Sequence, residues 1–323
     1  MSFTHAHLRL IMIIEAREGC ELRILKEGNV TVNYPYPDMD RERLAVIDNI
    51  ERAHSEADSF RSVEPCDFVV DEAILSKMRG RFDFIRKSPT SKIKRRIAYW
   101  LMRECERQIS AKTTVDGYEN LLGIDGGFII ASNYFSYTDS GLFRHLLSKL
   151  SPVRELYILI NEGELFKKGR LGFFMRNANT LPLFSGSEYT EKRLKAALLE
   201  IAAKGGAVLS HPEEQMWFNY KMPRPHGGKL YRLARELFLP VVPVFVELRE
   251  DEGCDSLGFY PLRYSVHALP PVYPRESASV ISDAERMCEE VYLSMLECYR
   301  SSYGLTGKEQ FNPFLHIGGY RGE

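Results

Sequence analysis

The 323-residue sequence has no hydrophobic run near the roughly 20 residues that a membrane-spanning helix needs. The apolar stretch at residues 8–14 is short, and no small-residue cleavage site follows it, so we interpret it as a strand. The sequence also has no G-x-G-x-x-G or Walker loop, no H-E-x-x-H and no G-x-S-x-G elbow. These absences argue against nucleotide-binding proteins, zinc proteases and serine hydrolases, and we expect a cytoplasmic protein.

Charge and cysteine content exclude further classes. Lys and Arg number 43 and Asp and Glu 44, so the net charge of −1 gives the chain as a whole no attraction to nucleic acid. The six cysteines show no C-x-x-C pair or zinc spacing, and we interpret them as free thiols. We interpret His5 and His7, close to the N-terminus, as incidental. We therefore expect no metal, no cofactor and no nucleic-acid partner.

Positive charge is concentrated in one segment, residues 77–107, where eleven basic residues face three acidic ones. Apolar residues recur there at helical spacing: Ile93, Ile97, Trp100, Leu101, Cys105 and Ile109. A basic amphipathic helix with a tryptophan is typical of a membrane interface, but the same stripe can dock on the protein itself. Both interpretations stay open, and one helix can do both. We expect peripheral attachment to an anionic membrane surface, on its inner face.

The rest of the chain alternates between strand and helix patterns. Buried strands are predicted at residues 128–131, 157–160, 207–209 and 241–246, and helices at 141–150, 190–203, 230–237 and 283–303. This alternation predicts an α/β fold with a mostly parallel sheet flanked by helices. The predicted units are an N-terminal segment of unknown role (1–70, with short strands at 8–14, 21–25 and 30–33), a basic helical arm (71–112), the α/β domain (113–304) and a loose tail (305–323).

Polar and glycine-containing segments lie near the ends of these strands, where parallel sheets place their sites. They are residues 131–139, 171–177 and 209–217, followed by 239–244 at the start of the next strand. Their order and spacing resemble the four motif blocks of the glycerol-phosphate and lysophosphatidic acid acyltransferase family, over roughly residues 117–303. Residues 172–177 and 211–221 resemble a bacterial subgroup in particular.

The resemblance implies a glycerolipid acyltransferase-like fold, preceded by a helical N-terminal element that contacts membrane. It also implies an activity in phospholipid biosynthesis. A fatty acyl group would pass from acyl-CoA or acyl carrier protein to the hydroxyl of a lysophospholipid or a glycerol-phosphate.

The first block departs from the family at its central residue. The family pattern is Asn-His-x-Ser-x-x-Asp, in which the histidine is the general base and the aspartate orients it. Here Asn133, Ser136 and Asp139 match, whereas Tyr134 stands at the histidine position. A phenol with a pKa of about 10 is a poor base at neutral pH. General-base assistance is worth about 10²–10⁴-fold, so we expect Tyr134→His to raise turnover.

The other blocks match unevenly. The resemblance implies that Arg176 binds the acceptor phosphate, that Glu213 helps hold the acceptor and that Pro243 shapes the acyl pocket. Residues 214–216 replace the family's Gly-Thr-Arg, which leaves Lys221 or Arg224 to supply the second phosphate contact.

Several alternatives remain open. Asp139 could merely cap the helix that begins near Ser140. The protein could be an active acyltransferase with His211 as an altered base, or His211 could be structural. It could instead be a catalytically impaired family member that binds lipid, acyl thioester or a partner protein. Tyr134 could also be an introduced substitution in an ordinary enzyme.

Overall fold

The computed structural model describes residues 39–64, 72–167, 169–184, 188–255 and 257–322. The strands predicted at residues 8–14, 21–25 and 30–33, together with His5 and His7, lie outside these ranges. Of the cysteines within them, Cys105, Cys254, Cys288 and Cys298 are free thiols.

A seven-stranded sheet forms the centre of the described chain, in the order β1-β7-β6-β2-β5-β3-β4. Five neighbouring strands run parallel, while β7 is antiparallel to β6 and parallel to β1. The middle strands are continuous apolar runs because helices cover both of their faces. The strands are β1 (Thr113–Asp116), β2 (Phe128–Ser132), β3 (Leu156–Asn161), β4 (Thr180–Leu183), β5 (Ala207–Ser210), β6 (Val241–Glu250) and β7 (Leu262–Ala268).

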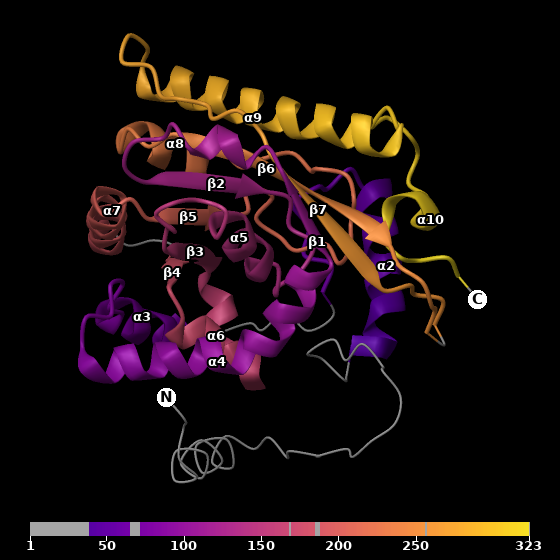
Figure 1. Cartoon of the computed structure of the whole chain (residues 1–323), viewed down its shortest axis with the longest axis horizontal. Coiled ribbons are helices and arrows are strands. Elements are labelled where there is room, and N and C mark those ends of the chain that lie inside the picture. The colour runs from indigo at the N-terminus through magenta and orange to yellow at the C-terminus, as the bar shows by residue number, and fades with distance from the viewer. Residues whose placement is uncertain (1–38, 65–71, 168, 185–187, 256, 323) are drawn as a thin grey trace.

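Helices cover the sheet in two layers (Figure 1). One face carries α7 (Glu188–Ala203), α8 (Lys229–Glu236) and α9 (Val280–Tyr303). The other carries α4 (Pro89–Ala111), α5 (Ser140–Leu147) and α6 (Gly169–Asn177). Helix α3 (Glu72–Arg81) contacts α7, where Arg193 donates to the Arg79 carbonyl at 3.5 Å. The predicted inward stripe of α7, Leu194, Leu198 and Ile201, is buried against the sheet. The α/β fold with a mostly parallel sheet is therefore confirmed.

Helix α4 is the predicted basic helix, but its inward face differs from the predicted stripe. Ala98 and Met102 are its buried residues, whereas Ile93 and Trp100 are 57% and 40% exposed. The inward face of α4 is therefore centred on Ala98 and Met102, which were not part of the predicted apolar stripe. Trp100, the largest apolar side chain of the predicted stripe, and Ile93 point outward instead, beside the basic residues.

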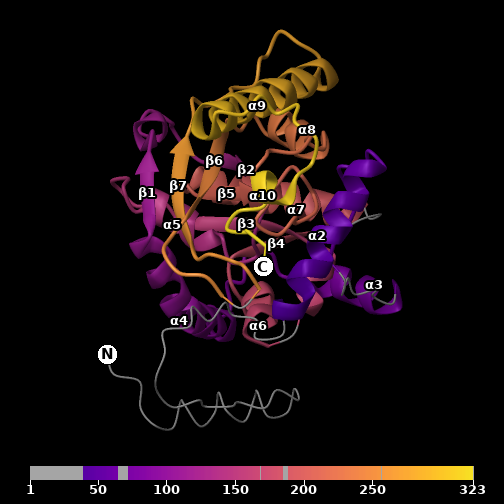
Figure 2. The same cartoon turned by 90° about the vertical axis from the view of Figure 1, so that its right-hand side faces the viewer.

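Two segments, one before and one after the sheet in the sequence, pack where the central strands end, against the loop after β5 (Figure 2). Helix α2 (Met39–Ser55) buries Val46, Ile47 and Ile50 against a cluster that includes Trp217. The C-terminal segment follows α9 and contains α10 (Pro313–His316), after which Ile317 is fully buried. The expected loose tail is thus wrong for these residues: they dock on the loop after β5, where the Gly318 amide donates to the Asn219 carbonyl at 2.7 Å. No helix in the described ranges is long and apolar enough to span a membrane.

Candidate active site

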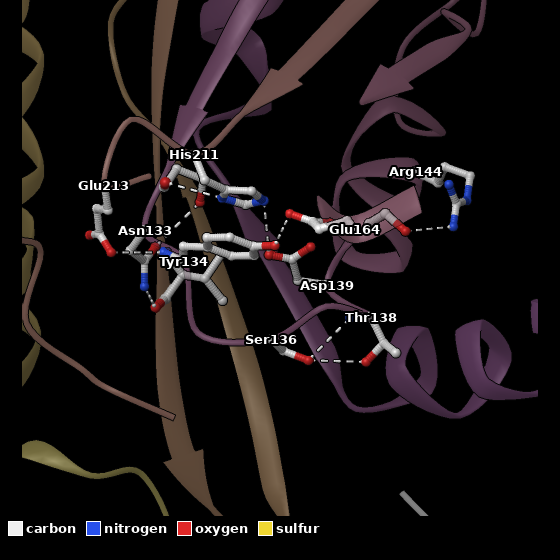
Figure 3. A network of polar contacts seen from close by, with 12 residues as sticks. Asn133, Tyr134, Ser136, Thr138, Asp139, Arg144, Glu164, His211 and Glu213 are labelled. Carbon is white, nitrogen blue, oxygen red and sulfur yellow. Dashed lines mark hydrogen bonds and ion pairs between the residues drawn. The ribbon is translucent and has the colours of Figure 1, made fainter. Parts of the chain in front are cut away.

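The candidate site lies where the neighbouring strands β2 and β5 end. The register of the pair sets Ala131 opposite Ser210, so the loops that follow start side by side. Tyr134 comes from the first loop and His211 from the second. Their rings stack almost in parallel, with centroids 4.1 Å apart and planes 5° from parallel (Figure 3). The fold therefore brings a histidine onto the residue that occupies the family's histidine position.

His211 pairs with Asp139, the matching aspartate of the first block. His211 Nε2 lies 3.3 Å from Asp139 Oδ2, and Nδ1 lies 3.3 Å from the Ser132 carbonyl oxygen. Asp139 directly precedes α5, but its side chain makes no capping hydrogen bond to that helix. The capping interpretation is therefore wrong, and the carboxylate faces the imidazole instead.

The surroundings of His211 favour its charged form. Burial alone would lower the pKa of the imidazole, and its side chain is only 7% exposed. The carboxylate of Asp139, the carbonyl of Ser132 and the carboxylate of Glu213 outweigh burial, so the pKa of His211 is raised above 6.5. His211 is thus a buried imidazole that can hold a proton near neutral pH.

Tyr134 is a hydrogen-bond donor in this site. Its hydroxyl donates to Glu164 Oε1 at 3.0 Å, and burial raises the pKa of the phenol well above 10. A phenol in that state stays protonated at neutral pH and cannot serve as a general base. Glu164 comes from the short helix η2 (Glu162–Phe166) after β3, and burial raises the pKa of its carboxyl to about 7.

Glu213 links the two loops by hydrogen bonds, and its carboxylate is not exposed to solvent. Its Oε2 accepts from the Tyr134 amide at 3.1 Å, and its Oε1 accepts from the Arg224 amide at 3.0 Å. The Arg224 guanidinium also pairs with Glu213 at 3.1 Å and donates to the carbonyls of Ser59 and Gln215. Glu213 and Arg224 are each about 2% exposed. Both predicted ligand-binding residues therefore meet at the site, but as a buried ion pair.

Asn133 and Ser136 shape the first loop. The Asn133 amide exchanges two hydrogen bonds with the backbone of Val246, at 3.1 and 2.9 Å, which continues the pairing between β2 and β6. The Ser136 hydroxyl accepts from the Thr138 amide at 3.2 Å, which tightens the turn before Asp139. Pro243 is buried in β6, where it lies opposite Ala131.

Within the described ranges, Arg176 and Lys221 contact groups other than the His211–Asp139 pair. Arg176 Nη1 donates to the carbonyls of Leu165 and Lys167, at 3.0 and 2.9 Å. Lys221 lies under the C-terminal segment, where its amide donates to the His316 carbonyl at 2.8 Å. Its ammonium group lies 5.6 Å from the centre of the Tyr303 ring. Their suggested phosphate contacts stay predictions.

The departure in the third block has a conformational consequence. Glu214 has a φ of 64°, in the left-handed region that favours glycine, and it stands where the family has glycine. The chain therefore keeps the backbone shape of that block without its glycine, at a cost of roughly 1–2 kcal/mol.

Chemically, the cluster offers a buried base with an orienting carboxylate. Within the described ranges, no group of three or more His, Cys, Asp or Glu side chains is placed to hold a metal ion. The sequence proposed Asp139 and His211 separately, and the fold pairs them. Glu164, in contrast, was missed: it follows the predicted strand at residues 157–160, whose exit shows the polar run Asn161-Glu162-Gly163-Glu164.

Comparison with known proteins found a family model and a solved structure that this chain resembles. Residues 112–247 match the family model described as Acyltransferase. A solved structure, the 1-acyl-sn-glycerophosphate (LPA) acyltransferase PlsC from Thermotoga maritima, is similar with a TM-score of 0.45 and 14% identity, over 72% of this chain and 88% of that chain. Among curated proteins, none matches this chain. The family match runs from just before β1 into β6 and includes Tyr134, Asp139, Glu164 and His211, so this part of the chain is similar to that family.

Proposed function

We propose that this protein transfers a fatty acyl group from a thioester to a glycerolipid hydroxyl, with His211 as general base and Asp139 as its orienting carboxylate. The observation that carries the proposal is the pairing of His211 with Asp139 where strands β2 and β5 end. An alcohol attacks a thioester poorly unless a base with a pKa near neutrality removes its proton. His211 supplies the imidazole that position 134 lacks.

We assign separate tasks to the two ring nitrogens. Nε2 faces the Asp139 carboxylate and keeps its proton, so Nδ1 is the nitrogen that exchanges one. Nδ1 takes the proton of the acceptor hydroxyl as the hydroxyl oxygen attacks the thioester carbonyl carbon. When the tetrahedral intermediate collapses, the carbon–sulfur bond breaks and the thiolate takes that proton. An ester and a free thiol leave, and the ring is neutral again.

The same geometry stabilises the intermediate state of the imidazole. Once charged, the ring has one N–H facing Asp139 and the other facing the Ser132 carbonyl. Before the transfer Nδ1 carries no proton, so it makes no hydrogen bond to the Ser132 carbonyl oxygen 3.3 Å away, and its lone pair can accept the proton of the acceptor hydroxyl. Interactions that strengthen as charge develops are those that accelerate a reaction.

Donor and acceptor follow from the motif resemblance. We propose acyl-CoA or acyl carrier protein as donor, a lysophospholipid or glycerol-phosphate as acceptor, and a place in phospholipid biosynthesis. Arg176 and Lys221 stay proposals for the acceptor phosphate, and Pro243 for the acyl pocket.

An acyl-transfer assay tests the proposal. Purified protein is supplied with palmitoyl-CoA or palmitoyl acyl carrier protein, and with lysophosphatidate or glycerol 3-phosphate, and thiol release is measured. We expect His211→Ala to lose about 10²–10⁴-fold in turnover, the usual worth of a general base. His267→Ala is the matched control: its imidazole also faces a carboxylate, Glu247 at 3.1 Å, but on strand β7. A His211→Ala variant as fast as the parent would contradict the proposal.

One observation favours a second candidate, a catalytically impaired protein that binds lipid or acyl thioester. Both nitrogens of His211 face protein oxygens, and Tyr134 covers one face of the ring. Calorimetric binding of lysophosphatidate or of a non-hydrolysable acyl-CoA analogue, without thiol release from any donor–acceptor combination, would favour this candidate.

The structure also changes what we expect of Tyr134→His. Asp139 already pairs with His211, so a second imidazole at position 134 would compete for a single carboxylate. It would also remove the hydroxyl that Glu164 accepts from. We now expect Tyr134→His to lower turnover rather than raise it, in the same thiol-release assay.

We further propose a cytoplasmic protein that attaches peripherally to the inner face of a membrane through α4. Ile93 and Trp100 point outward, and they are flanked by the exposed basic residues Lys92, Lys94, Arg96 and Arg103. Each basic residue near an anionic surface contributes about 1 kcal/mol, and salt screens the effect. Co-sedimentation with phosphatidylglycerol vesicles should fall with added salt and with Trp100→Ala. Equal binding to phosphatidylcholine vesicles at high salt would contradict the mechanism.

A further inference from the structure

Glu164 is a buried carboxylate at the site to which the motif resemblance gives no role. It is 7% exposed, and it lies in η2 directly after β3. Its Oε1 accepts from the Tyr134 hydroxyl, while its Oε2 is buried without a hydrogen-bond partner in the described structure. Burying a carboxylate costs free energy unless the carboxylate is hydrogen-bonded or paired with an opposite charge. Because Glu164 contacts the stacked Tyr134–His211 pair directly, we ask how it affects that pair.

The second motif block holds the turn that carries Glu164. Arg176 Nη1 donates to the carbonyl of Leu165, within η2, and to that of Lys167, directly after η2. Gly172 allows this contact, because a Cβ there would lie 1.6 Å from the Lys167 carbonyl oxygen. At the other end of the turn, the Asn161 side chain donates to the Glu214 carbonyl at 2.7 Å and ties the turn to the loop after β5.

Glu164 in turn fixes Tyr134, and Tyr134 fixes His211. The hydrogen bond of 3.0 Å holds the phenol at its far end, while the Glu213 carboxylate holds its backbone amide. The phenol ring lies flat on the imidazole, so the imidazole cannot tilt without displacing it. An imidazole kept in this plane keeps Nε2 directed at Asp139 (Figure 3).

We infer that Glu164, supported by Arg176 and Gly172, is a positioning residue that holds Tyr134 on His211 and thereby keeps the imidazole against Asp139. Its effect on turnover rests on the proposed acyl transfer, whereas its effect on the imidazole does not. A base must be held in the productive geometry by packing and by hydrogen bonds around it. In this chain the histidine–aspartate pair is thus held in place through Tyr134, which lies between Glu164 and the imidazole.

Glu164 also acts on the charge of the site. His211 and Lys167 favour its ionised form, against burial, while Asp139 and Glu213 favour the charged form of His211. An ionised Glu164 and a protonated His211 therefore stabilise each other in the same buried cluster. Removing the charge of Glu164 while keeping its shape should make His211 lose its proton at lower pH.

The experiment compares three variants of the full chain: Glu164→Gln, Glu164→Ala and Tyr134→Phe. Glutamine keeps a carbonyl oxygen for the Tyr134 hydroxyl, alanine removes the acceptor, and phenylalanine removes the donor but keeps the ring. Glu162→Gln is the matched control, because Glu162 lies on the same turn and pairs with Arg79 instead. The readouts are kcat and KM, the pH profile of turnover, and the ¹⁵N spectrum of the His211 ring, assigned with His211→Ala.

We expect Glu164→Ala to lower kcat by about 10²-fold with KM little changed, as for a displaced catalytic group. Its His211 ring signals should shift and broaden, and Tyr134→Phe should move them in the same direction. Glu164→Gln should restore most of kcat relative to alanine, with the acidic limb of the pH profile shifted to lower pH. Glu162→Gln should match the parent.

Two results would overturn the inference. The first is an unchanged His211 ring spectrum in both Tyr134→Phe and Glu164→Ala. The second is an unchanged ring spectrum in Tyr134→Phe if Glu164→Ala does not fold. If the parent shows no acyl transfer, the proposed function fails. The ring spectra still decide whether Glu164 positions the imidazole, because they do not depend on turnover.

Discussion

Two histidines in the segment after β5, His211 and His226, have similar neighbours and opposite properties. Each lies beside a tyrosine ring: His211 stacks on Tyr134 at 4.1 Å, and His226 lies 6.0 Å from Tyr231 with the planes 12° apart. The pKa of His211 is raised above 6.5. Burial, followed by the charge of Arg224, lowers the pKa of His226 to about 3.

The difference between them is a carboxylate. His211 faces Asp139, whereas His226 Nδ1 meets the Tyr231 hydroxyl at 2.6 Å and its Nε2 has no hydrogen-bond partner among the described residues. Burial therefore makes an imidazole neutral by default, and a paired acid is needed to keep it able to exchange protons near pH 7. With a pKa of about 3, His226 is neutral near pH 7 and is too weak a base to take a proton from a hydroxyl there.

Removing the carboxylate should make His211 resemble His226. We expect Asp139→Asn to lower the pKa of His211, because an amide stabilises the charged ring less than a carboxylate does. Turnover should fall by about 10²–10⁴-fold, since the base loses both its charge partner and its fixed tautomer. The measurements are a ¹⁵N titration of the His211 ring and the thiol-release assay. An unchanged titration would mean that Asp139 does not distinguish the two histidines.

Glu164 extends the comparison to a buried acid whose pKa is raised to about 7. Between pH 4.5 and 7 the folded state binds a proton that the unfolded chain has released, so stability falls as pH rises through this window. The raised pKa of His211 acts in the same direction. The protonated imidazole stabilises the folded state below pH 6.5, and this contribution is lost as the pH rises through the pKa of His211 in the folded protein.

Glu164→Gln should remove the contribution of Glu164, which is at most about 3 kcal/mol. We therefore expect the melting temperature of the variant to fall less than that of the parent between pH 5 and pH 8. Glu162→Gln, measured in parallel, should follow the parent. If the two curves run parallel across the window, burial does not raise the pKa of Glu164.

The sequence predicted the strands at the centre of the sheet because they are uninterrupted apolar runs. It missed β1 and β7, whose alternating polar residues belong to the sheet's edge region. It placed Asp139 and His211 at the ends of two strands but could not pair them, since strand order is set by long-range packing. Glu164 was missed because the exit of β3 matches no motif. The roles of Arg176 and Glu213 as braces depend on backbone groups that no residue pattern reveals.

The smallest expected effect is that of Tyr231→Phe, which removes the hydroxyl that His226 meets at 2.6 Å. Because His226 is neutral and belongs to no proton transfer, turnover in the thiol-release assay should match that of the parent. The lost hydrogen bond should lower the free energy of unfolding by about 1 kcal/mol, measured by urea denaturation. Tyr134→Phe makes the same chemical change beside His211, where we expect the ring spectrum and turnover to respond. If Tyr231→Phe slowed turnover as much as Tyr134→Phe, loss of either hydroxyl would have the same effect. The slower turnover of Tyr134→Phe could then be explained by disturbed packing, without a role in holding His211. The carboxylates around His211 would then no longer explain what separates the two histidines.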